Sequence, residues 1–266
     1  MAEVVLWHIT FSNFNEKARW ALDYKRVPHK RRAPPNGTHV ALALFLTRGA
    51  QRTFPVVRID GRSLGDSTAI IAELERRFPD PPLYPEDPEE RRHALELEDF
   101  FDENYGHEVR RLVFWHLMAD EETAAAAVQN VAGPHWAGVL TRMGPGLRKY
   151  LFAYYGIDAE SAERAHELIV AGFDRIESER AGRDYLVGDR FSVADLTAAA
   201  LVGPLLLPPE FPWHPRDGYP PALERVRDEL SQHPAADWIR RTYARHRLPA
   251  SRPGSQLLPE GCRSAA

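Results

Sequence analysis

A serine and two asparagines stand just ahead of a predicted helix, where their side chains could act on a bound anion. Residues 12–15 read Ser-Asn-Phe-Asn, and helix-forming residues follow from Glu16 to Tyr24. The first turn of a helix carries partial positive charge and free N–H groups, which favour an anion such as a thiolate. Each unit by which a thiol pKa falls below about 8.5 represents about 1.4 kcal/mol in favour of the thiolate. Ser12 is therefore a candidate sulfur ligand with Asn15 as the alternative, while N-capping by Ser12 is a second interpretation.

A second polar pair, Asp66-Ser67, opens another predicted helix. The Ser67 hydroxyl and the free N–H groups of a first turn suit a carboxylate, whereas Asp66 suits an ammonium group. Together they fit the two charges of an α-amino-acid group. A plain N-cap role for the pair is compatible with that use.

Other familiar catalytic arrangements are not supported by the sequence. The chain has 11 histidines, but no His-x-x-x-His pattern. Ser12 does not lie in a Gly-x-Ser-x-Gly elbow. We therefore expect neither a metal site nor a Ser-His-Asp hydrolase.

The elements that would position these residues alternate between strand and helix patterns up to residue 80. Asp60-Gly61 supplies the positive φ angles of a tight hairpin turn. Apolar residues at three- and four-residue spacing give the helix from Asp66 to Phe78 one buried stripe. The predicted elements are strands at 4–9, 29–32, 54–59 and 62–64, and helices at 16–24 and 66–78.

A proline-rich connector divides the chain. Residues 79–88 contain five prolines, which excludes both helix and central strand and predicts a stiff, extended segment. We expect a first domain at 1–80, a linker at 81–88, an all-helical domain at 89–248 and a flexible tail at 249–266. The predicted helices of the second domain are 89–118, 121–130, 147–155, 159–180, 193–202, 221–231 and 234–246.

One helix of the second domain has a strong start signal. Ser192 and Asp195 have the spacing of a capping box, and Phe191 and Leu196 form a hydrophobic staple around them. This pattern nucleates a helix and presents no free reactive group.

Composition excludes several classes of function. The net charge is −4, although residues 1–80 carry 13 Lys and Arg against 8 Asp and Glu. No long basic run suggests nucleic-acid binding, and no apolar run of 18 residues or targeting pattern suggests a membrane or secreted protein. The single cysteine, Cys262, allows neither an internal disulfide nor a cysteine-based metal site. We expect a cytoplasmic protein.

Taken together, these motifs resemble the cytosolic glutathione transferase family, in its bacterial type with a serine-like N-terminal motif. The resemblance covers roughly residues 3 to 245. It rests on four stretches in the family's order, on both sides of the proline-rich linker: residues 12–19, residues 54–57, residues 65–71 and the capping box at 192–195. It implies an α/β thioredoxin-like domain with the order β-α-β-α-β-β-α, followed by an all-α helical bundle.

The resemblance also implies roles for individual residues. Ser12 matches the residue that activates the glutathione sulfur, although Asn13 stands where serine-type members often have proline. Pro55 matches a cis proline, and the backbone of Phe54 would pair with the cysteinyl part of glutathione. Asp66 and Ser67 would hold its γ-glutamyl end. For the other end of the ligand, the candidates are Arg52, Gln51 and His39.

Because residues 12–15 contain no cysteine, disulfide exchange at this position is excluded and the thiol must arrive with the ligand. We expect an enzyme that uses glutathione, or a similar low-molecular-weight thiol, as cosubstrate and holds no tightly bound cofactor. Its second substrate would be a hydrophobic electrophile bound beside aromatic residues of the helical domain. The alternative is that these residues form an ordinary core: Phe101, Tyr105, Phe114, Trp115 and His116. The resemblance implies a homodimer. The alternative is a non-catalytic binding or assembly protein on the same scaffold.

Overall fold

The first part of the chain forms a four-stranded sheet. The computed structural model describes residues 3–34, 38–120, 122–124, 126–127 and 144–247. The sheet has the order β2-β1-β3-β4, in which β2 runs parallel to β1 and the other neighbours are antiparallel. The predicted order β-α-β-α-β-β-α is confirmed, with these elements: β1 (Val4–Trp7), α1 (Asn13–Tyr24), β2 (Lys30–Arg32), α2 (His39–Leu46), β3 (Val56–Ile59), β4 (Arg62–Gly65) and α3 (Ser67–Arg77).

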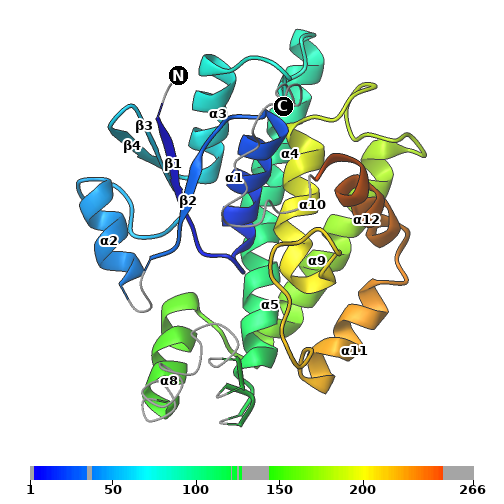
Figure 1. The fold of residues 1–266 in the computed structure, drawn as a ribbon. Helices are drawn as coiled ribbons and strands as arrows, with labels where there is room; N and C mark the ends of the chain where they lie inside the picture. Colours follow the sequence, from blue (N-terminus) through cyan, green and yellow to red (C-terminus); the bar gives the residue numbers. More distant parts are fainter. Residues whose placement is uncertain (1–2, 35–37, 121, 125, 128–143, 248–266) are drawn as a thin grey trace, which may run out of the picture.

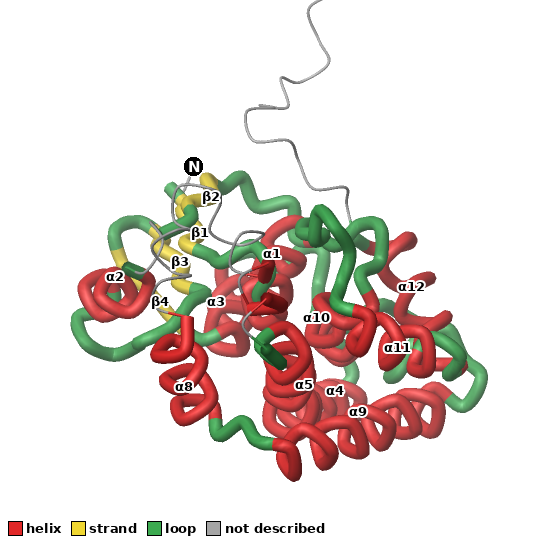
Figure 2. The backbone as a smooth tube through the Cα atoms, turned by 90° about the horizontal axis from the view of Figure 1, so that it is seen from below, coloured by secondary structure: helices red, strands yellow, loops and turns green. Residues whose placement is uncertain are grey.

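The sheet lies between two unequal helical layers (Figures 1 and 2). Helices α1 and α3 lie on the face toward the helical domain, whereas α2 lies on the opposite face. Helix α1 is buried along most of its length, since it packs against the sheet on one side and against α10 on the other. The side chains of Val4, Leu6, Val57 and Ile59 therefore belong to a core that continues into the second domain.

The proline-rich segment packs between the two domains. No helix or strand is assigned between Arg77 and Pro88. Leu83 is buried, its N–H donates to Glu75 Oε1 at 2.8 Å, and its carbonyl accepts from Val193 N at 2.8 Å. The segment is thus held in place by both domains.

The second part of the described chain is helical, as predicted. Its elements are α4 (Pro88–Phe101), the π-helix η1 (Asp102–Gly106), α5 (His107–Leu117), α8 (Gly144–Tyr155), α9 (Ala159–Arg180), α10 (Val193–Leu206), α11 (Pro221–Leu230) and α12 (Pro234–His246). The single helix expected at 89–118 is interrupted by η1. Of the helix expected at 121–130, residues 122–124 and 126–127 are described and helical, and the tail at 249–266 lies outside the described residues.

Helix α10 is the central helix of the molecule, because all of its residues are buried. Asp195 accepts hydrogen bonds from the N–H and the hydroxyl of Ser192, at 2.8 and 2.9 Å. The predicted end at residue 202 is wrong, since the helix continues through Pro204 to Leu206. Proline in the last turn removes a single backbone bond, and complete burial of the helix outweighs that loss. None of the helices in the described ranges has the length and apolar character needed to cross a membrane.

Candidate active site

The predicted ligand-binding residues gather at one edge of the sheet, where β1 and β4 end and β3 begins. Ser12 follows the end of β1, and Phe54 and Pro55 precede the start of β3, whose Val56 pairs with Trp7. The register of β3 with β4 places Gly65 opposite Val56, so Asp66 follows at the same edge. Antiparallel pairing therefore brings together three segments that are far apart in the sequence.

Ser12 stands at the N-terminus of α1 with its hydroxyl hydrogen available. Its backbone is extended, and its side chain makes no capping hydrogen bond. Asn15 Nδ2 donates to Ser12 Oγ at 2.7 Å. Since the oxygen is the acceptor in this bond, the hydroxyl hydrogen of Ser12 can be donated to another group.

Asn15 is fully engaged in supporting the loop. Its side chain is buried, and besides Ser12 its Nδ2 donates to the Phe54 carbonyl at 3.0 Å. Its Oδ1 accepts from Ile9 N at 3.0 Å. The amide thus links the end of β1, the start of α1 and the residue before Pro55.

A buried arginine fixes the loop that carries Ser12. Arg19 donates to the carbonyls of Ile9 and Thr10 at 3.0 and 2.9 Å, and its Nε pairs with Glu16 Oε2 at 2.8 Å. Arg19 also donates to His8 Nδ1 at 2.9 Å. Because a guanidinium only donates, this nitrogen of His8 carries no proton. Burial, assisted by the charge of Arg19, lowers the pKa of His8 to about 3.

The Phe54-Pro55 peptide bond is cis, as the resemblance implies. Phe54 is buried, and its carbonyl already accepts from Asn15. Its N–H has no hydrogen-bond partner within the described ranges. This corner therefore offers a backbone donor beside Ser12.

Asp66 and Ser67 stand at the start of α3 with different exposure. Asp66 is exposed, has a φ of 72°, and accepts from Ala69 N at 3.0 Å as the N-cap. Ser67 is buried and its hydroxyl makes no hydrogen bond to any other described residue. The capping role is thus filled by Asp66, which leaves the Ser67 hydroxyl available to a ligand.

The three candidates for the other end of the ligand differ in position. Gln51 lies against Gly65, where a Cβ atom would stand 2.3 Å from Gln51 Cγ. Arg52 is exposed and makes no ion pair or hydrogen bond with the described part of the chain. His39 begins α2, and burial lowers its pKa. Arg52 is the charged group of the three.

Two interdomain contacts at this end of α1 escaped the sequence reasoning. Asn13 Nδ2 donates to the carbonyls of Gly106 and Leu201 at 2.8 and 3.0 Å. Lys17 Nζ lies 2.5 Å from Asp102 Oδ2 and donates to Thr68 Oγ1 at 2.8 Å. Both involve η1, and π-turns of this kind are frequent at functional sites. The sequence shows asparagine at position 13, where serine-type members of the family that it resembles often have proline. It does not show the partners of the Asn13 side chain.

The comparisons with known proteins agree with this geometry. The family model described as "Glutathione S-transferase, N-terminal domain" matches residues 6–82, and "Glutathione S-transferase, C-terminal domain" matches residues 159–229. These matches together span more than half of the chain. The chain belongs to the glutathione S-transferase family.

Individual members of the family are distant relatives. The maleylacetoacetate isomerase of Dictyostelium discoideum is 25% identical over 205 residues, covering 75% of this chain and 78% of that protein. A glutathione S-transferase from Methylobacterium radiotolerans, solved with glutathione sulfonate, is 26% identical with a TM-score of 0.53, covering 89% of this chain and 94% of that one. A rice enzyme solved with glutathione shares the fold at 17% identity and a TM-score of 0.59, covering 92% and 87%.

The helical side of this glutathione transferase meets the Ser12 loop through aromatic rings. The ring of Phe14 lies 5.0 Å from that of His107 at the start of α5. On the other side, Phe11 lies 6.0 Å from Trp213, which belongs to the loop between α10 and α11. Trp213 is a contact that the sequence analysis did not identify.

Four of the five residues expected near the electrophile divide into two groups, and the fifth, His116, is half-buried in the last turn of α5. Phe101 and Tyr105 are fully buried and belong to the core. Phe114 and Trp115 instead pack against α8, 5.5 Å from Tyr155 and 5.9 Å from Phe152 between ring centroids.

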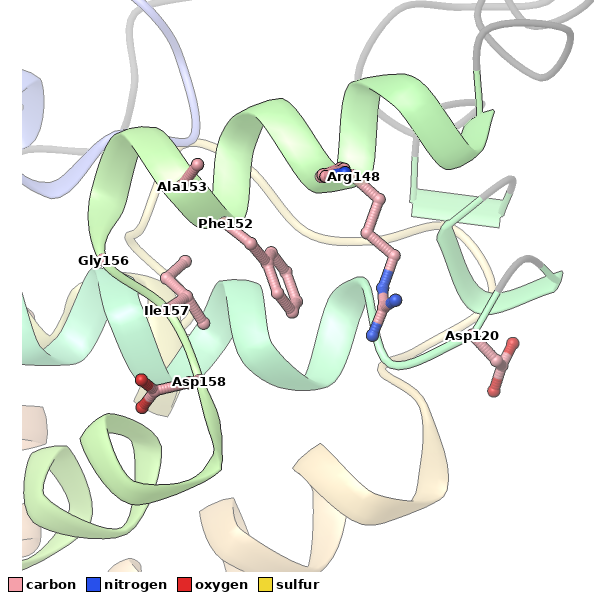
Figure 3. Close-up of a pocket in the computed structure, with 8 residues that line it drawn as sticks. Asp120, Arg148, Phe152, Ala153, Gly156, Ile157 and Asp158 are labelled. Carbon is pink, nitrogen blue, oxygen red and sulfur yellow. The ribbon is translucent and has the colours of Figure 1, made fainter.

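A cavity of about 820 Å³ lies elsewhere on the transferase, between α8 and the end of α5 (Figure 3). Phe152 and Arg148 project into it from α8, and Asp120 lies at its edge. None of the predicted binding residues lines it. Arg148 is held there by the carbonyls of Met118 and Ala119. The unpaired donors described above lie at the edge of the sheet and not in this cavity.

Proposed function

We propose that this glutathione transferase binds glutathione at the sheet edge and activates its thiolate through Ser12 for attack on an electrophilic small molecule. The observation that carries the proposal is the Ser12 hydroxyl, which accepts from Asn15 and keeps its own hydrogen for the sulfur. A hydrogen bond to a charged group contributes about 1.5–3 kcal/mol, which favours the thiolate over the thiol.

The rest of the site suits the remaining parts of glutathione. The unpaired N–H of Phe54 would bind the cysteinyl backbone, as an added strand pairs with a sheet edge. The Ser67 hydroxyl and the first turn of α3 would bind the γ-glutamyl carboxylate, with Asp66 near its ammonium group. Arg52 would bind the glycyl carboxylate. Asn15 would act as a positioning residue for Ser12.

The test compares Ser12→Ala with the unchanged protein, using immobilised glutathione for binding and an aryl halide for conjugation. We expect Ser12→Ala to keep its retention on glutathione and to lose roughly 10- to 100-fold in turnover. An unchanged turnover would remove Ser12 from the mechanism and point to Asn15. A wild-type protein that neither binds glutathione nor conjugates the halide would instead support the non-catalytic alternative.

We further infer that the protein works as a homodimer in the cytoplasm, with a thiol-binding domain at 1–80 and a helical domain at 89–248. Family membership supports the dimer, and the single cysteine is consistent with a reducing compartment. Light scattering at several protein concentrations tests the dimer. A constant monomer mass would contradict it.

A further inference from the structure

Arg110 is a half-buried cation whose partners among the described residues are uncharged. It lies on α5, one turn after His107, and its Nη2 donates to His107 Nδ1 at 2.9 Å. Its guanidinium lies over the Tyr155 ring of α8, 4.6 Å from the centroid. Burial lowers the pKa of Arg110, but a guanidinium stays charged at neutral pH.

Three other buried or half-buried arginines of the described chain have carboxylate partners, whereas Arg148 donates to backbone carbonyls. Arg19 pairs with Glu16, Arg31 with Asp23, and Arg111, the next residue on α5, with Glu108. Arg110 forms no ion pair with any described residue. A cation withdrawn from water without a counter-charge favours the arrival of an anion.

The position of Arg110 connects it to the proposed reaction centre. Phe14, two residues after Ser12, has its ring 5.0 Å from that of His107, which is hydrogen-bonded to Arg110. The structure therefore links Ser12 to Arg110 through two adjoining rings. Helix α8 stands beside α5 on the side of the sheet domain (Figures 1 and 2).

The surroundings of Arg110 also favour an aromatic ligand. Tyr155 covers the guanidinium and stacks on Phe114 at 5.5 Å, with an interplanar angle of 28°. His107 adds a third flat side chain. Its Nδ1 accepts from Arg110, so the ring proton of neutral His107 is on Nε2. Flat rings around one unpaired cation match a planar molecule that carries a negative group.

We propose that Arg110 binds the anionic substituent of the electrophile, so that the preferred substrates are aromatic electrophiles carrying a carboxylate or a similar anion. This inference rests on the proposed function. With an aryl chloride as the probe, the glutathione thiolate attacks the ring carbon that bears chlorine. The C–S bond forms, the C–Cl bond breaks, and chloride leaves with the bonding electron pair.

The test uses two probes that differ in one charge, 4-chloro-3-nitrobenzoate and the neutral 4-chloro-3-nitrobenzamide. The measured quantity is the ratio of kcat/KM for the acid to that for the amide, because this ratio cancels general damage to the site. We expect Arg110→Gln to lower the ratio roughly 10- to 100-fold. Arg110→Lys, which keeps the charge but loses the planar fork, should lower the ratio less than Arg110→Gln does.

Arg111→Gln is the matched control, since it removes a neighbouring guanidinium that is already paired with Glu108. Its ratio should equal that of the unchanged protein. A ratio that Arg110→Gln leaves unchanged, or that Arg111→Gln lowers equally, would overturn the role of Arg110. So would wild-type conjugation of the amide alone. Conjugation of neither probe would overturn the proposed function itself, and this inference with it.

Discussion

The two parts of α1 use polar side chains in opposite ways. At its N-terminus, the Ser12 hydroxyl hydrogen and the nearby Phe54 N–H have no partner in the described part of the chain. Further along, Glu16 pairs with both Arg19 and Arg247, at 2.8 and 2.6 Å, and all three side chains are buried.

This difference separates the binding function from the stability of the fold. Arg247 follows α12 and also pairs with Asp23 at 2.6 Å, so the end of the helical domain is fixed to α1 by charge. Arg19, which shares Glu16 with Arg247, also donates hydrogen bonds to the carbonyls of the Ser12 loop. The paired charges tie the loop to both domains, and the donors at its end have no partner among the described residues.

Glu16→Ala should have the largest effect on stability. It removes the carboxylate between two buried guanidinium groups and leaves Arg19 without a carboxylate partner, so we expect a loss of about 3–5 kcal/mol. Urea unfolding measures it. Glu89→Ala removes a carboxylate paired with Arg92 on the surface and is the control, with an expected change below about 1 kcal/mol. Equal losses in both variants would contradict the comparison.

The His8 contact with Arg19 should make the protein sensitive to acid. The native state keeps His8 neutral with a pKa of about 3, while the unfolded chain binds a proton near the ordinary value of 6.5. Stability is therefore fully present above pH 6.5 and falls as the pH approaches 3, by roughly 3 kcal/mol between pH 7 and pH 4.

The variant His8→Asn keeps an acceptor near Nδ1 but cannot titrate. Unfolding free energies measured from pH 7 to pH 4 should fall less steeply for this variant than for the unchanged protein. The fall that remains would include His246, whose pKa burial lowers to about 4. Parallel curves for the two proteins would show that His8 does not contribute.

Asn13→Ala should have an intermediate effect. The change leaves the carbonyls of Gly106 and Leu201 without this donor at a buried interdomain contact, so we expect a loss of about 2 kcal/mol. Asn104→Ala, which removes an exposed amide in the same region, should change stability by less than about 0.5 kcal/mol. If thermal unfolding shows both variants equal to the parent, the Asn13 contact does not hold the domains together.

Ser12→Ala should change stability least, by about 1 kcal/mol or less, because it removes one acceptor of Asn15 and no helix cap. Asn15→Ala should cost more, since three hydrogen bonds depend on its amide. Chemical unfolding and turnover are both measured for each variant, so that its loss of stability can be compared with its loss of activity. A Ser12→Ala protein as destabilised as Asn15→Ala would place Ser12 among the supporting residues.

Local sequence signals predicted most of the helices and strands, but not the contacts that α1 makes with the second domain. The Asp60-Gly61 turn and the stripe of apolar residues in α3 are read from neighbours in the chain, and both are present. The residues 16, 17 and 19 of α1 are charged, yet their side chains are fully buried. Periodicity finds the face of a helix that packs on a sheet, but it does not show a second domain covering the opposite face.

For the site, the sequence by itself determined the residue types and their order: a serine ahead of α1, a proline ahead of β3, an Asp-Ser pair ahead of α3, and no cysteine in residues 12–15. Only the tertiary structure decided which donors remain available. Asn15 is committed to the loop, Asp66 caps α3, and Arg110 lacks a counter-charge among the described residues. The physical reason is that a polar group is available to a ligand only when no neighbour satisfies it, and those neighbours come from segments as much as 231 residues apart.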